Sequence, residues 1–392
     1  MARLGTSFRL VSAVSAGLWH LQGRPLYHSD TKSCISTSRT RSASACQTVR
    51  RPCVAVCGDI FMDIMAPIKK LPVWDSDVEA ESVKMVPGGS ALNQGRQLHS
   101  LGVPVRFVGA VGKDAIGHAL LEQVSGQGFP TDSIKTFSNL PSSGQRLHDV
   151  GAPQQLERVQ GVCIVLSGPA DRAFVSCYST TDAFTERDLQ EQAHKLEDCT
   201  HFHLGGYFNM KGLQSHDFTQ FVADAKRSKQ WTISLNSQAC SNGHWCGEDN
   251  HLASFLDHVD LLFVNASEGE HICAALCPDS DRSISALCKR YPELMVVITQ
   301  GSHGCTAYRH QMPAVYVPAK QTRVVDTTGA GDAFIAGFLS SWLPHAAPKR
   351  SEAEQKAIVD ACKKGHAVAS VVLGREGACV EPVRPRDLKD LE

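Results

Sequence analysis

Short apolar runs alternate with helical stretches over the second half of the chain, and this alternation constrains the fold more than any other feature. Each run has the length of a buried strand, and each stretch between runs is long enough for a helix. A strand-helix-strand order places parallel strands in one sheet and packs helices on its two faces. The runs lie at 200–204, 231–235, 260–264, 294–299 and 314–318, and the helical stretches begin near residues 186, 214, 250 and 280.

The first half of the chain adds elements of the same kind and one insertion. Apolar runs predict strands at 53–57 and 106–112, and apolar periodicity predicts helices at 91–101 and 115–127. The insertion shows in two runs, 161–166 and 173–178, which the turn sequence S-G-P-A-D-R joins as a hairpin.

We therefore expect an α/β fold: a doubly wound, mostly parallel sheet with helices on both faces and a small β-sheet lid. The lid is expected from about 64–88 and 145–182, within one domain spanning 53–385. The last helices are predicted at 332–343 and 352–373, and 386–392 form a C-terminal tail.

Composition excludes several classes of protein. The 392 residues have a formal net charge of −1, so a nucleic-acid partner is not expected. The sequence has no uninterrupted apolar segment of about 18 residues, the length that a membrane-spanning helix needs. The 15 cysteines are scattered and no pair has C-x-x-C spacing, which favours buried thiols over a disulfide or zinc framework.

Residues 1–52 differ from the rest of the chain. They are rich in serine, threonine and arginine, and Asp30 is their one acid. This composition resembles a transit peptide and predicts a mitochondrial or plastid location. The mildly apolar stretch 10–18 leaves a secretory signal open, and a disordered tail without a targeting role would leave the protein cytoplasmic.

The segment V-V-D-T-T-G-A-G-D-A-F at 324–334 is the most informative motif for chemistry. A glycine-rich loop joins an apolar run to a helix, so backbone N–H groups of residues 329–332 can surround an anion at the helix N-terminus. Asp332 stands beside this anion site and can accept a proton from an incoming hydroxyl group. The alternative is a tight turn with Asp332 as a helix N-cap.

This segment resembles the signature of the ribokinase-like (PfkB) family of carbohydrate kinases, and the resemblance extends over roughly 53–385. It implies an ATP-dependent phosphotransferase with Asp332 as the catalytic base. Gly329, Ala330 and Gly331 match the family's anion hole. Asp326 and Thr328 resemble positions near its monovalent-cation site, which would hold K⁺.

Further motifs match the family's substrate side. The segment P-G-G-S-A-L-N resembles the family element that meets the sugar, which assigns Gly88, Gly89 and Asn93 to substrate binding. Asp63 matches a position that binds substrate hydroxyls. Asp59 follows the first strand, where it is either a second substrate carboxylate or a turn residue.

Other motifs match the nucleotide side. Asn265 and Glu268 fit the family's N-x-x-E element, with Glu268 holding Mg²⁺ through water. Three residues of the T-x-G-x-x-G loop and one histidine complete the expected nucleotide contacts, the histidine packing against adenine: Thr299, Gly301, Gly304 and His366.

Several alternatives remain open at the level of sequence. A nucleoside kinase would use Phe61, Phe184 and Tyr207 as a slot for the base, and a phosphosugar kinase would need cations such as Arg146 and Lys84. A non-catalytic relative is a third reading, whereas a Rossmann dehydrogenase is disfavoured because no G-x-G-x-x-G follows the first strand. Unpaired edges of the lid strands make a homodimer through the lid a further expectation.

Overall fold

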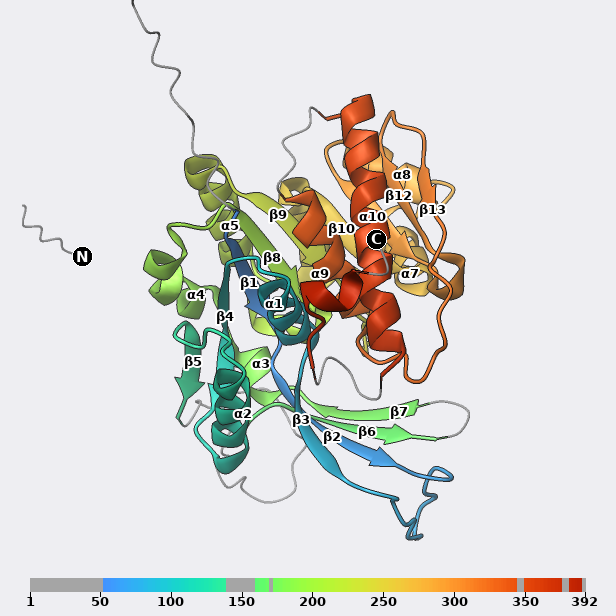
Figure 1. The fold of residues 1–392 in the computed structure, drawn as a ribbon. Helices are drawn as coiled ribbons and strands as arrows, with labels where there is room; N and C mark the ends of the chain where they lie inside the picture. Colours follow the sequence, from blue (N-terminus) through green and yellow to red (C-terminus); the bar gives the residue numbers. More distant parts are fainter. Residues whose placement is uncertain (1–51, 139–158, 169–171, 344–348, 376–380, 390–392) are drawn as a thin grey trace, which may run out of the picture. The chain divides into compact units, whose positions relative to one another are not determined.

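A nine-stranded sheet forms the centre of the computed structural model, which describes residues 52–138, 159–168, 172–343, 349–375 and 381–389 (Figure 1). Seven neighbouring strands, from β11 to β5, are parallel, and β12 and β13 are antiparallel. In order across the sheet, the strands are β13 (Val315–Val317), β12 (Cys305–Arg309), β11 (Met295–Thr299), β10 (Leu261–Asn265), β9 (Thr232–Asn236), β8 (His201–Gly205), β1 (Val54–Gly58), β4 (Val105–Gly112) and β5 (Ile134–Phe137).

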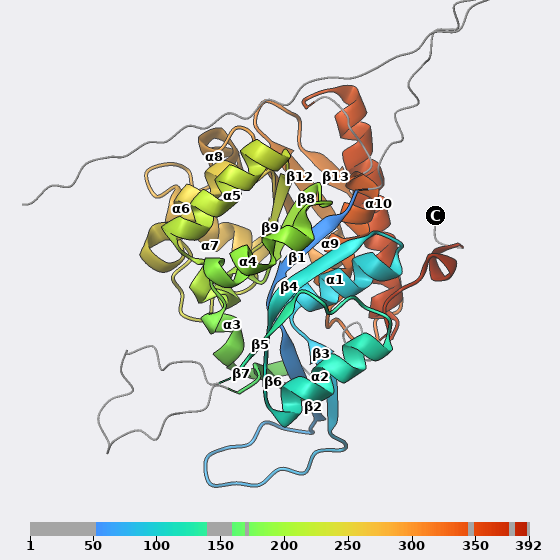
Figure 2. The ribbon, with the colours of Figure 1, turned by 90° about the vertical axis from the view of Figure 1, so that its left-hand side faces the viewer.

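Helices cover both faces of this sheet (Figure 2). Alternate side chains of strands such as β1 and β10 therefore enter two different apolar cores. Burial on both faces explains why the strands read as continuous apolar runs. One face packs against α1 (Ser90–Ser100), α2 (Ala115–Gly126), α9 (Ala330–Trp342) and α10 (Glu352–Leu373). The other packs against α4 (Glu186–Gln192), α5 (His216–Lys229), α6 (His251–Phe255), α7 (Ala266–Leu276) and α8 (Ile284–Arg290).

The strand order reverses at β1, which pairs with β4 on one side and β8 on the other. Open α/β sheets bind ligands at the carboxyl ends of the strands beside such a switch point. The loops after β1, β8, β9 and β10 therefore mark the expected position of a functional site.

A second sheet of four strands lies beyond this carboxyl edge (Figure 1). Its order is β3 (Lys84–Gly88), β2 (Phe61–Pro67), β6 (Val162–Ser167) and β7 (Arg172–Cys177), and a short helix, α3 (Ser179–Ala183), follows it. The pair β6–β7 is the predicted hairpin. The part of the expected lid at 145–158 lies outside the described residues, as do 390–392 of the tail.

The predicted fold class is confirmed, with corrections at one sheet edge and in one helix. The run at 314–318, predicted as a parallel strand, is the antiparallel strand β13, because the unpredicted β12 reverses the chain. The helix α7 was missing from the predicted series, although its first turn contains the N-x-x-E motif. Among the described residues, no helix is long and apolar enough to cross a membrane.

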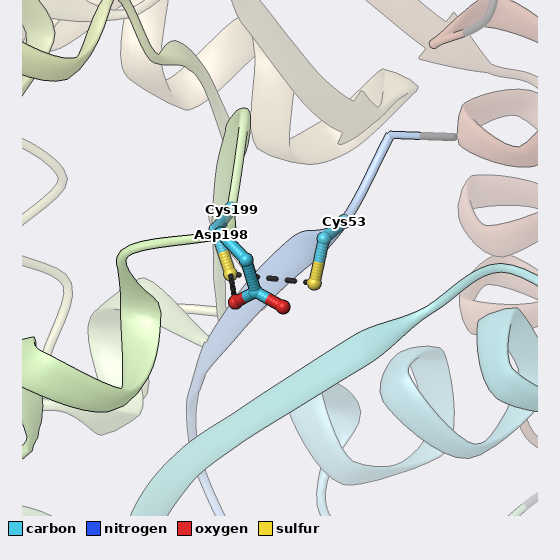
Figure 3. Close-up of side chains that lie close together, drawn as sticks. All are labelled: Cys53, Asp198 and Cys199. Atoms are coloured by element: carbon cyan, nitrogen blue, oxygen red, sulfur yellow. Dashed lines mark hydrogen bonds between the residues drawn. The ribbon is translucent and has the colours of Figure 1, made fainter. Parts of the chain in front are cut away.

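Two thiols meet at the opposite, amino-terminal edge of the sheet (Figure 3). The Sγ atoms of Cys53 and Cys199 lie 3.5 Å apart, and Trp231 donates a hydrogen bond to the Cys199 carbonyl. The neighbouring Asp198 is paired with Arg106 at 2.9 Å. The Asp198 carboxylate is therefore already in an ion pair. The contact between the two thiols connects the start of β1 to the chain just before β8.

Candidate active site

Asp332 lies buried in the first turn of α9 and faces α1 across the carboxyl edge of the sheet. Its carboxylate accepts hydrogen bonds from Ser90 Oγ at 2.6 Å, Asn93 Nδ2 at 3.0 Å and Gln94 Nε2 at 3.0 Å. The N-cap of α9 is Gly329 and not Asp332, so the carboxylate is directed away from its own helix end. The simple capping role does not describe this side chain.

Burial raises the pKa of the Asp332 carboxyl to about 7, and the nearby Asp59 charge acts in the same direction. The hydrogen bonds from Ser90, Asn93 and Gln94 favour the ionised form and lower the pKa against that effect. A carboxyl that titrates near neutral pH is suited to accept a proton from a hydroxyl group.

The glycine-rich loop beside Asp332 has the backbone geometry of an anion site. Gly329 adopts a left-handed conformation with φ 72°, which starts α9 abruptly. The N–H groups of Gly331 and Asp332 belong to the first turn of α9, where no preceding turn supplies carbonyl partners. Ala330 donates its N–H to the Thr327 carbonyl at 3.3 Å. Gly331 and Asp332 are thus the loop members whose amides are available to an anion.

Arg172 of β7 brings a positive charge to the same loop. Its guanidinium contacts the side chains of Asp326, Thr327 and Thr328. Asp326 also accepts hydrogen bonds from Thr328 N at 2.8 Å and Thr328 Oγ1 at 2.7 Å. The Arg172 guanidinium therefore occupies the place beside the Asp326 and Thr328 side chains where the monovalent cation was expected.

Three carboxylates gather near the switch point. Asp59 is buried after β1 and accepts hydrogen bonds from Ala91 N at 2.7 Å and Asn209 Nδ2 at 2.8 Å. Burial raises the pKa of Asp63 on β2 to about 7, and the charges of Asp59 and Asp332 add to that rise. Like charges this close repel one another, so the group favours ligands that donate hydrogen bonds.

Gly88, Gly89 and Asn93 border the same acidic region. A Cβ on Gly88 would lie 2.1 Å from the Asp63 carboxylate. Gly89 has φ 99°, and a Cβ there would lie 2.5 Å from the Asp59 carbonyl oxygen. Within the described residues, no donor reaches Asn93 Oδ1, a buried oxygen that can accept a ligand hydroxyl. The predicted substrate residues are thus brought together around Asp332.

Asn265 and Glu268 form a capping box at the start of α7. Each side chain accepts the other residue's backbone N–H, at 2.9 and 3.0 Å, and Asn265 Nδ2 also bonds Glu268 Oε1 at 2.8 Å. Burial raises the pKa of Glu268. The motif is therefore a helix start, and both side chains also line the cleft beside Asp332.

That cleft has a volume of about 430 Å³ and runs from the glycine-rich loop to the ends of β9, β10 and β11. Predicted residues that line it are Gly329, Gly331, Asp332, Thr328, Asn265, Glu268 and Thr299. Asn236, which the sequence offers only as a possible nucleotide contact, also lines it, as do Arg172, Phe174 and Gln238, which the sequence did not assign to the site.

Three expected nucleotide residues do not line this cleft. Gly301 and Gly304 lie in the turn between β11 and β12. His366 packs on the Phe334 ring, with 5.0 Å between ring centres, and borders a separate cavity of about 570 Å³. The cleft at Asp332 and the cavity at His366 therefore flank α9 at different places.

Ser90 and Gln94 were missed as site residues, although a signal for them exists in the sequence. Polar residues at 90, 93, 94 and 97 share one face of a helix whose first nine residues are buried. A polar stripe on a buried helix needs polar partners, and Asp332 is one of them.

The comparisons with known proteins identify the family. The model of the "pfkB family carbohydrate kinase" matches residues 52–144 and 150–384. The chain belongs to the pfkB family of carbohydrate kinases. Its members are phosphotransferases, and the predicted enzyme class is confirmed.

Similar proteins of this family differ in their substrates. The chain is 24% identical to an ATP-dependent ribose-1-phosphate kinase from Halopiger xanaduensis over 330 residues, covering 84% of this chain and 94% of the relative. It is 26% identical to adenosine kinase from Saccharomyces cerevisiae over 291 residues, covering 72% and 78%. These pfkB relatives leave the substrate open between sugars, phosphosugars and nucleosides.

Solved structures share the fold. Arabidopsis thaliana ribokinase complexed with ribose and ATP has a TM-score of 0.66 and 21% identity, covering 87% of this chain and 99% of that one. An Escherichia coli protein assigned as ribokinase II, in complex with ATP and Mg²⁺, has a TM-score of 0.65 and 20% identity, covering 87% and 98%. The ribokinase-like fold is thus shown for this chain.

Proposed function

We propose that this chain transfers the γ-phosphoryl group of ATP to a hydroxyl of a small sugar of the ribose or fructose type. The observation that supports this most is the Asp332 carboxylate, buried beside available helix N-terminal amides and across from the acidic pair Asp59 and Asp63. A base, an anion site and acceptors for substrate hydroxyls then meet at one edge of the sheet.

In this mechanism the sugar lies between the acidic pair and Asn93. Asp63 and Asn93 Oδ1 accept hydrogen bonds from substrate hydroxyls and orient the reacting one toward Asp332. Asp332 takes the hydroxyl proton as the oxygen attacks the γ-phosphorus. The amides of Gly331 and Asp332 stabilise negative charge on the transferred group.

ATP is proposed to place its phosphates in the cleft lined by Thr299, Glu268 and the glycine-rich loop. An oxygen-rich wall of this kind fits Mg²⁺, which retains waters in most protein sites. Glu268 would hold the ion through water, and Mg²⁺ would neutralise charge on the phosphates. Packing of adenine on His366 stays part of the proposal and requires the nucleotide to reach the second cavity, beside α10.

The monovalent-cation site at Asp326 and Thr328 stays a prediction without a step in the mechanism. The Arg172 guanidinium already neutralises Asp326, at 3.3 Å, so K⁺ on that side would meet a like charge. Arg172 lines the cleft with Gly329 and Asp332, and we assign it to the phosphoryl group that leaves ATP.

The three aromatic residues considered for a nucleoside base support the proposal of a sugar. Phe184 and Tyr207 are fully buried in the main core, and Phe61 is buried against Tyr178, so none of the three forms an open slot. Of the cations considered for a phosphosugar, Lys84 lies on β3 and Arg146 lies outside the described residues.

The base assignment is tested with Asp332→Asn in the full chain. Turnover should fall by about 10³-fold or more, because an amide cannot accept the proton, while ATP affinity measured by calorimetry changes less than about threefold. Asp224→Asn, an exposed carboxylate on α5, serves as the matched control and should be fully active. Near-normal turnover of Asp332→Asn would overturn the proposed function.

The substrate is tested by ADP release with ribose, fructose, ketodeoxygluconate, adenosine and pseudouridine. We expect kcat/KM to be highest for one of the three sugars. A preference for either nucleoside by tenfold or more would replace the sugar by a nucleoside as the acceptor and leave the role of Asp332 unchanged.

We also propose a homodimer formed through the four-stranded sheet. Its outer face has a cross-strand row of apolar side chains, Met85, Ile64, Ile164 and Val175, of which Val175 is 59% exposed. Such a row on an open sheet is a typical interaction surface.

Residues 1–52 are proposed to direct the protein to a mitochondrion or plastid. Eight arginines and lysines against one acid support this reading. Fusion of residues 1–52 to a fluorescent protein should send it to one of these organelles; a diffuse cytoplasmic signal would contradict the proposal.

A further inference from the structure

A line of buried polar side chains connects the middle of the large sheet to the proposed base. His201 and His203 alternate with apolar residues on β8 and are fully buried on the face that packs against α1 and α9. Each imidazole makes two short hydrogen bonds. The contacts are Thr232 Oγ1 to His201 Nδ1 at 2.6 Å, His201 Nε2 to Ser234 Oγ at 2.7 Å, Ser234 Oγ to His203 Nδ1 at 2.6 Å and His203 Nε2 to Gln94 Oε1 at 2.6 Å.

The Gln94 amide links this line to Asp332. Its NH₂ group lies 3.0 Å from Asp332 Oδ1 and 2.9 Å from Asn236 Oδ1. Both are acceptors, because Asp332 is a carboxylate and Asn236 directs its own NH₂ toward the Phe263 carbonyl at 3.3 Å. A flipped amide would place oxygen against these two oxygens, so the NH₂ group must face them.

This orientation fixes every proton along the line. With its NH₂ group on Asp332, Gln94 presents only an oxygen to His203, so His203 must be protonated at Nε2 and accept at Nδ1. Ser234 then donates to His203, and its oxygen accepts from His201 Nε2. Thr232 donates to His201 Nδ1. Each donor meets one acceptor, as buried polar groups require.

Both imidazoles are neutral in this arrangement. Burial lowers the pKa of His201 and of His203 to about 3, and the charge of one opposes protonation of the other. The line therefore supplies no charge to Asp332 at neutral pH. The line instead orients the Gln94 amide, since among the described residues the neutral Nε2–H group of His203 is the donor that reaches the Gln94 oxygen.

We propose that His203 is a positioning residue for the phosphoryl-transfer reaction, acting through Gln94 to keep an N–H group directed at the Asp332 carboxylate. The Gln94 oxygen sets the tautomer of His203, and Ser234, which accepts a hydrogen bond from His201, donates to the other ring nitrogen of His203. The inference rests on the proposed role of Asp332 as the base and adds a residue that lies outside the cleft and touches neither substrate nor nucleotide.

The expected effect concerns the pH at which Asp332 ionises. Without His203 the Gln94 amide can rotate, and the N–H that favours the ionised carboxylate is lost; an oxygen in its place repels the charge. Other charged groups near Asp332 are Asp59 and Asp63 on the substrate side and Glu268 and Arg172 in the cleft. All four charged groups remain in a His203 variant, so a shift in the pKa of Asp332 would report on the hydrogen bonds from His201 to Gln94.

The first experiment uses the unaltered full chain. In ¹⁵N-histidine-labelled protein, long-range ¹⁵N–¹H correlation spectra should show His203 protonated at Nε2 and unprotonated at Nδ1 throughout pH 5.5–8.5, with the signal assigned by its loss in His203→Gln. A proton on Nδ1, or an imidazolium in this range, would overturn the proposal. This result does not depend on catalysis, so it separates failure of the inference from failure of the proposed function.

The second experiment compares pH profiles of kcat. His203→Met should move the acidic limb upward by about one pH unit, the equivalent of one lost hydrogen bond to a charged group. His203→Gln, which restores a donor near the Nε2 position, should recover more than half of this shift. If His203→Met does not fold, the partial shift of His203→Gln and the tautomer measurement decide.

The matched control is His251→Met. His251 is also buried with a lowered pKa, of about 4, and bonds two hydroxyls, Tyr207 at 2.9 Å and Thr219 at 2.7 Å, away from Asp332. It should lose a similar amount of thermal stability and keep the wild-type limb. An unshifted limb in His203→Met, or an equal shift in His251→Met, would reduce His203 to a core residue.

Discussion

The two sheets of this protein differ in how far their side chains are exposed to solvent. The central strands of the nine-stranded sheet are buried on both faces, whereas β7 of the four-stranded sheet has Phe174, Val175 and Cys177 exposed. The large sheet supplies the edge on which Asp332, Asn265 and Thr299 are fixed. The small sheet supplies Asp63 and Arg172 from strands that other elements cover less completely.

This contrast teaches where chemistry and recognition lie. The groups proposed to act on the reacting atoms are placed on elements with two packed faces, where side-chain motion is small. The groups proposed to meet the substrate first are placed on a sheet with one open face. Changes on the large sheet should therefore lower kcat, changes on the inner face of the small sheet should act on KM as well, and changes on its outer face should affect assembly.

After Asp332→Asn, the largest effect is expected for Gly331→Ala. A Cβ at this position would meet nothing within 4 Å, so the variant should fold, and alanine in a first helical turn should stabilise it by about 0.5–1 kcal/mol. The methyl group would fill the space proposed for the phosphoryl group, and kcat should fall by about 10²–10³-fold. Steady-state kinetics and thermal melting measure the two effects.

Gly126→Ala on α2 is the control for Gly331→Ala, since its added Cβ also meets nothing within 4 Å. It should gain stability and keep full activity. If Gly331→Ala were fully active, the proposed position of the phosphoryl group at the glycine-rich loop would be wrong.

Arg172→Met should have the next largest effect. The loss of the guanidinium breaks the ion pair with Asp326 and removes a positive charge from the cleft, so kcat should fall by about 10–100-fold, with a rise in KM for ATP. Arg187→Met, an exposed arginine on α4, is the control and should be silent. Equal kinetics of the two variants would leave Arg172 only a structural role, connecting β7 to the glycine-rich loop.

Asp63→Asn should raise KM for the sugar by about tenfold and lower kcat less, because it weakens a hydrogen bond made before and during the reaction. Initial rates over a range of sugar concentrations measure this split. A change in kcat alone would indicate that Asp63 acts in the chemical step and not in substrate binding.

The same variant should be more stable than the wild type at pH 8 and no more stable at pH 4. The pKa of Asp63 is about 7 in the folded protein, above the ordinary value of 3.8 for an aspartate, so its ionisation lowers the free energy of unfolding as the pH rises between these values. The melting temperature at pH 8 should rise by about 2–4 °C. An unchanged melting temperature at pH 8 would show that ionisation of the buried Asp63 does not destabilise the folded protein.

The smallest effect on activity is expected for Ile164→Lys, on the outer face of the small sheet. It should convert a dimer to a monomer in sedimentation velocity and change kcat by less than about twofold. Val73→Lys, which alters an exposed apolar residue outside the row, should remain dimeric. A wild-type monomer would contradict the proposed interface.

The sequence predicted much of the large sheet because its buried strands are short apolar runs between helices. The predicted run 231–235 and the observed β9 (Thr232–Asn236) differ by one residue at each end. Strand direction was harder, since a run such as 314–318 has the same composition whether it is parallel or antiparallel. The missing β12 contains Thr306 and Arg309, which interrupt its apolar pattern.

The candidate site was predictable where its residues are neighbours in sequence and harder to predict where they are not. Gly329, Gly331 and Asp332 form one motif. Arg172 reaches Asp326 from 154 residues away, and no local pattern indicates this contact. His201 and His203 do have a local signal, two polar residues on one face of an apolar strand, but their partner on α1 lies 109 residues from His203.

Two carboxyl groups with pKa values of about 7 make the empty site a buffer at physiological pH. A sugar that donates hydrogen bonds to ionised Asp63 and Asp332 will expel the protons that each holds part of the time. The apparent heat of sugar binding near pH 7 will therefore depend on the ionisation enthalpy of the buffer. It will differ between phosphate and Tris buffers. Isothermal titration in the two media counts the released protons directly.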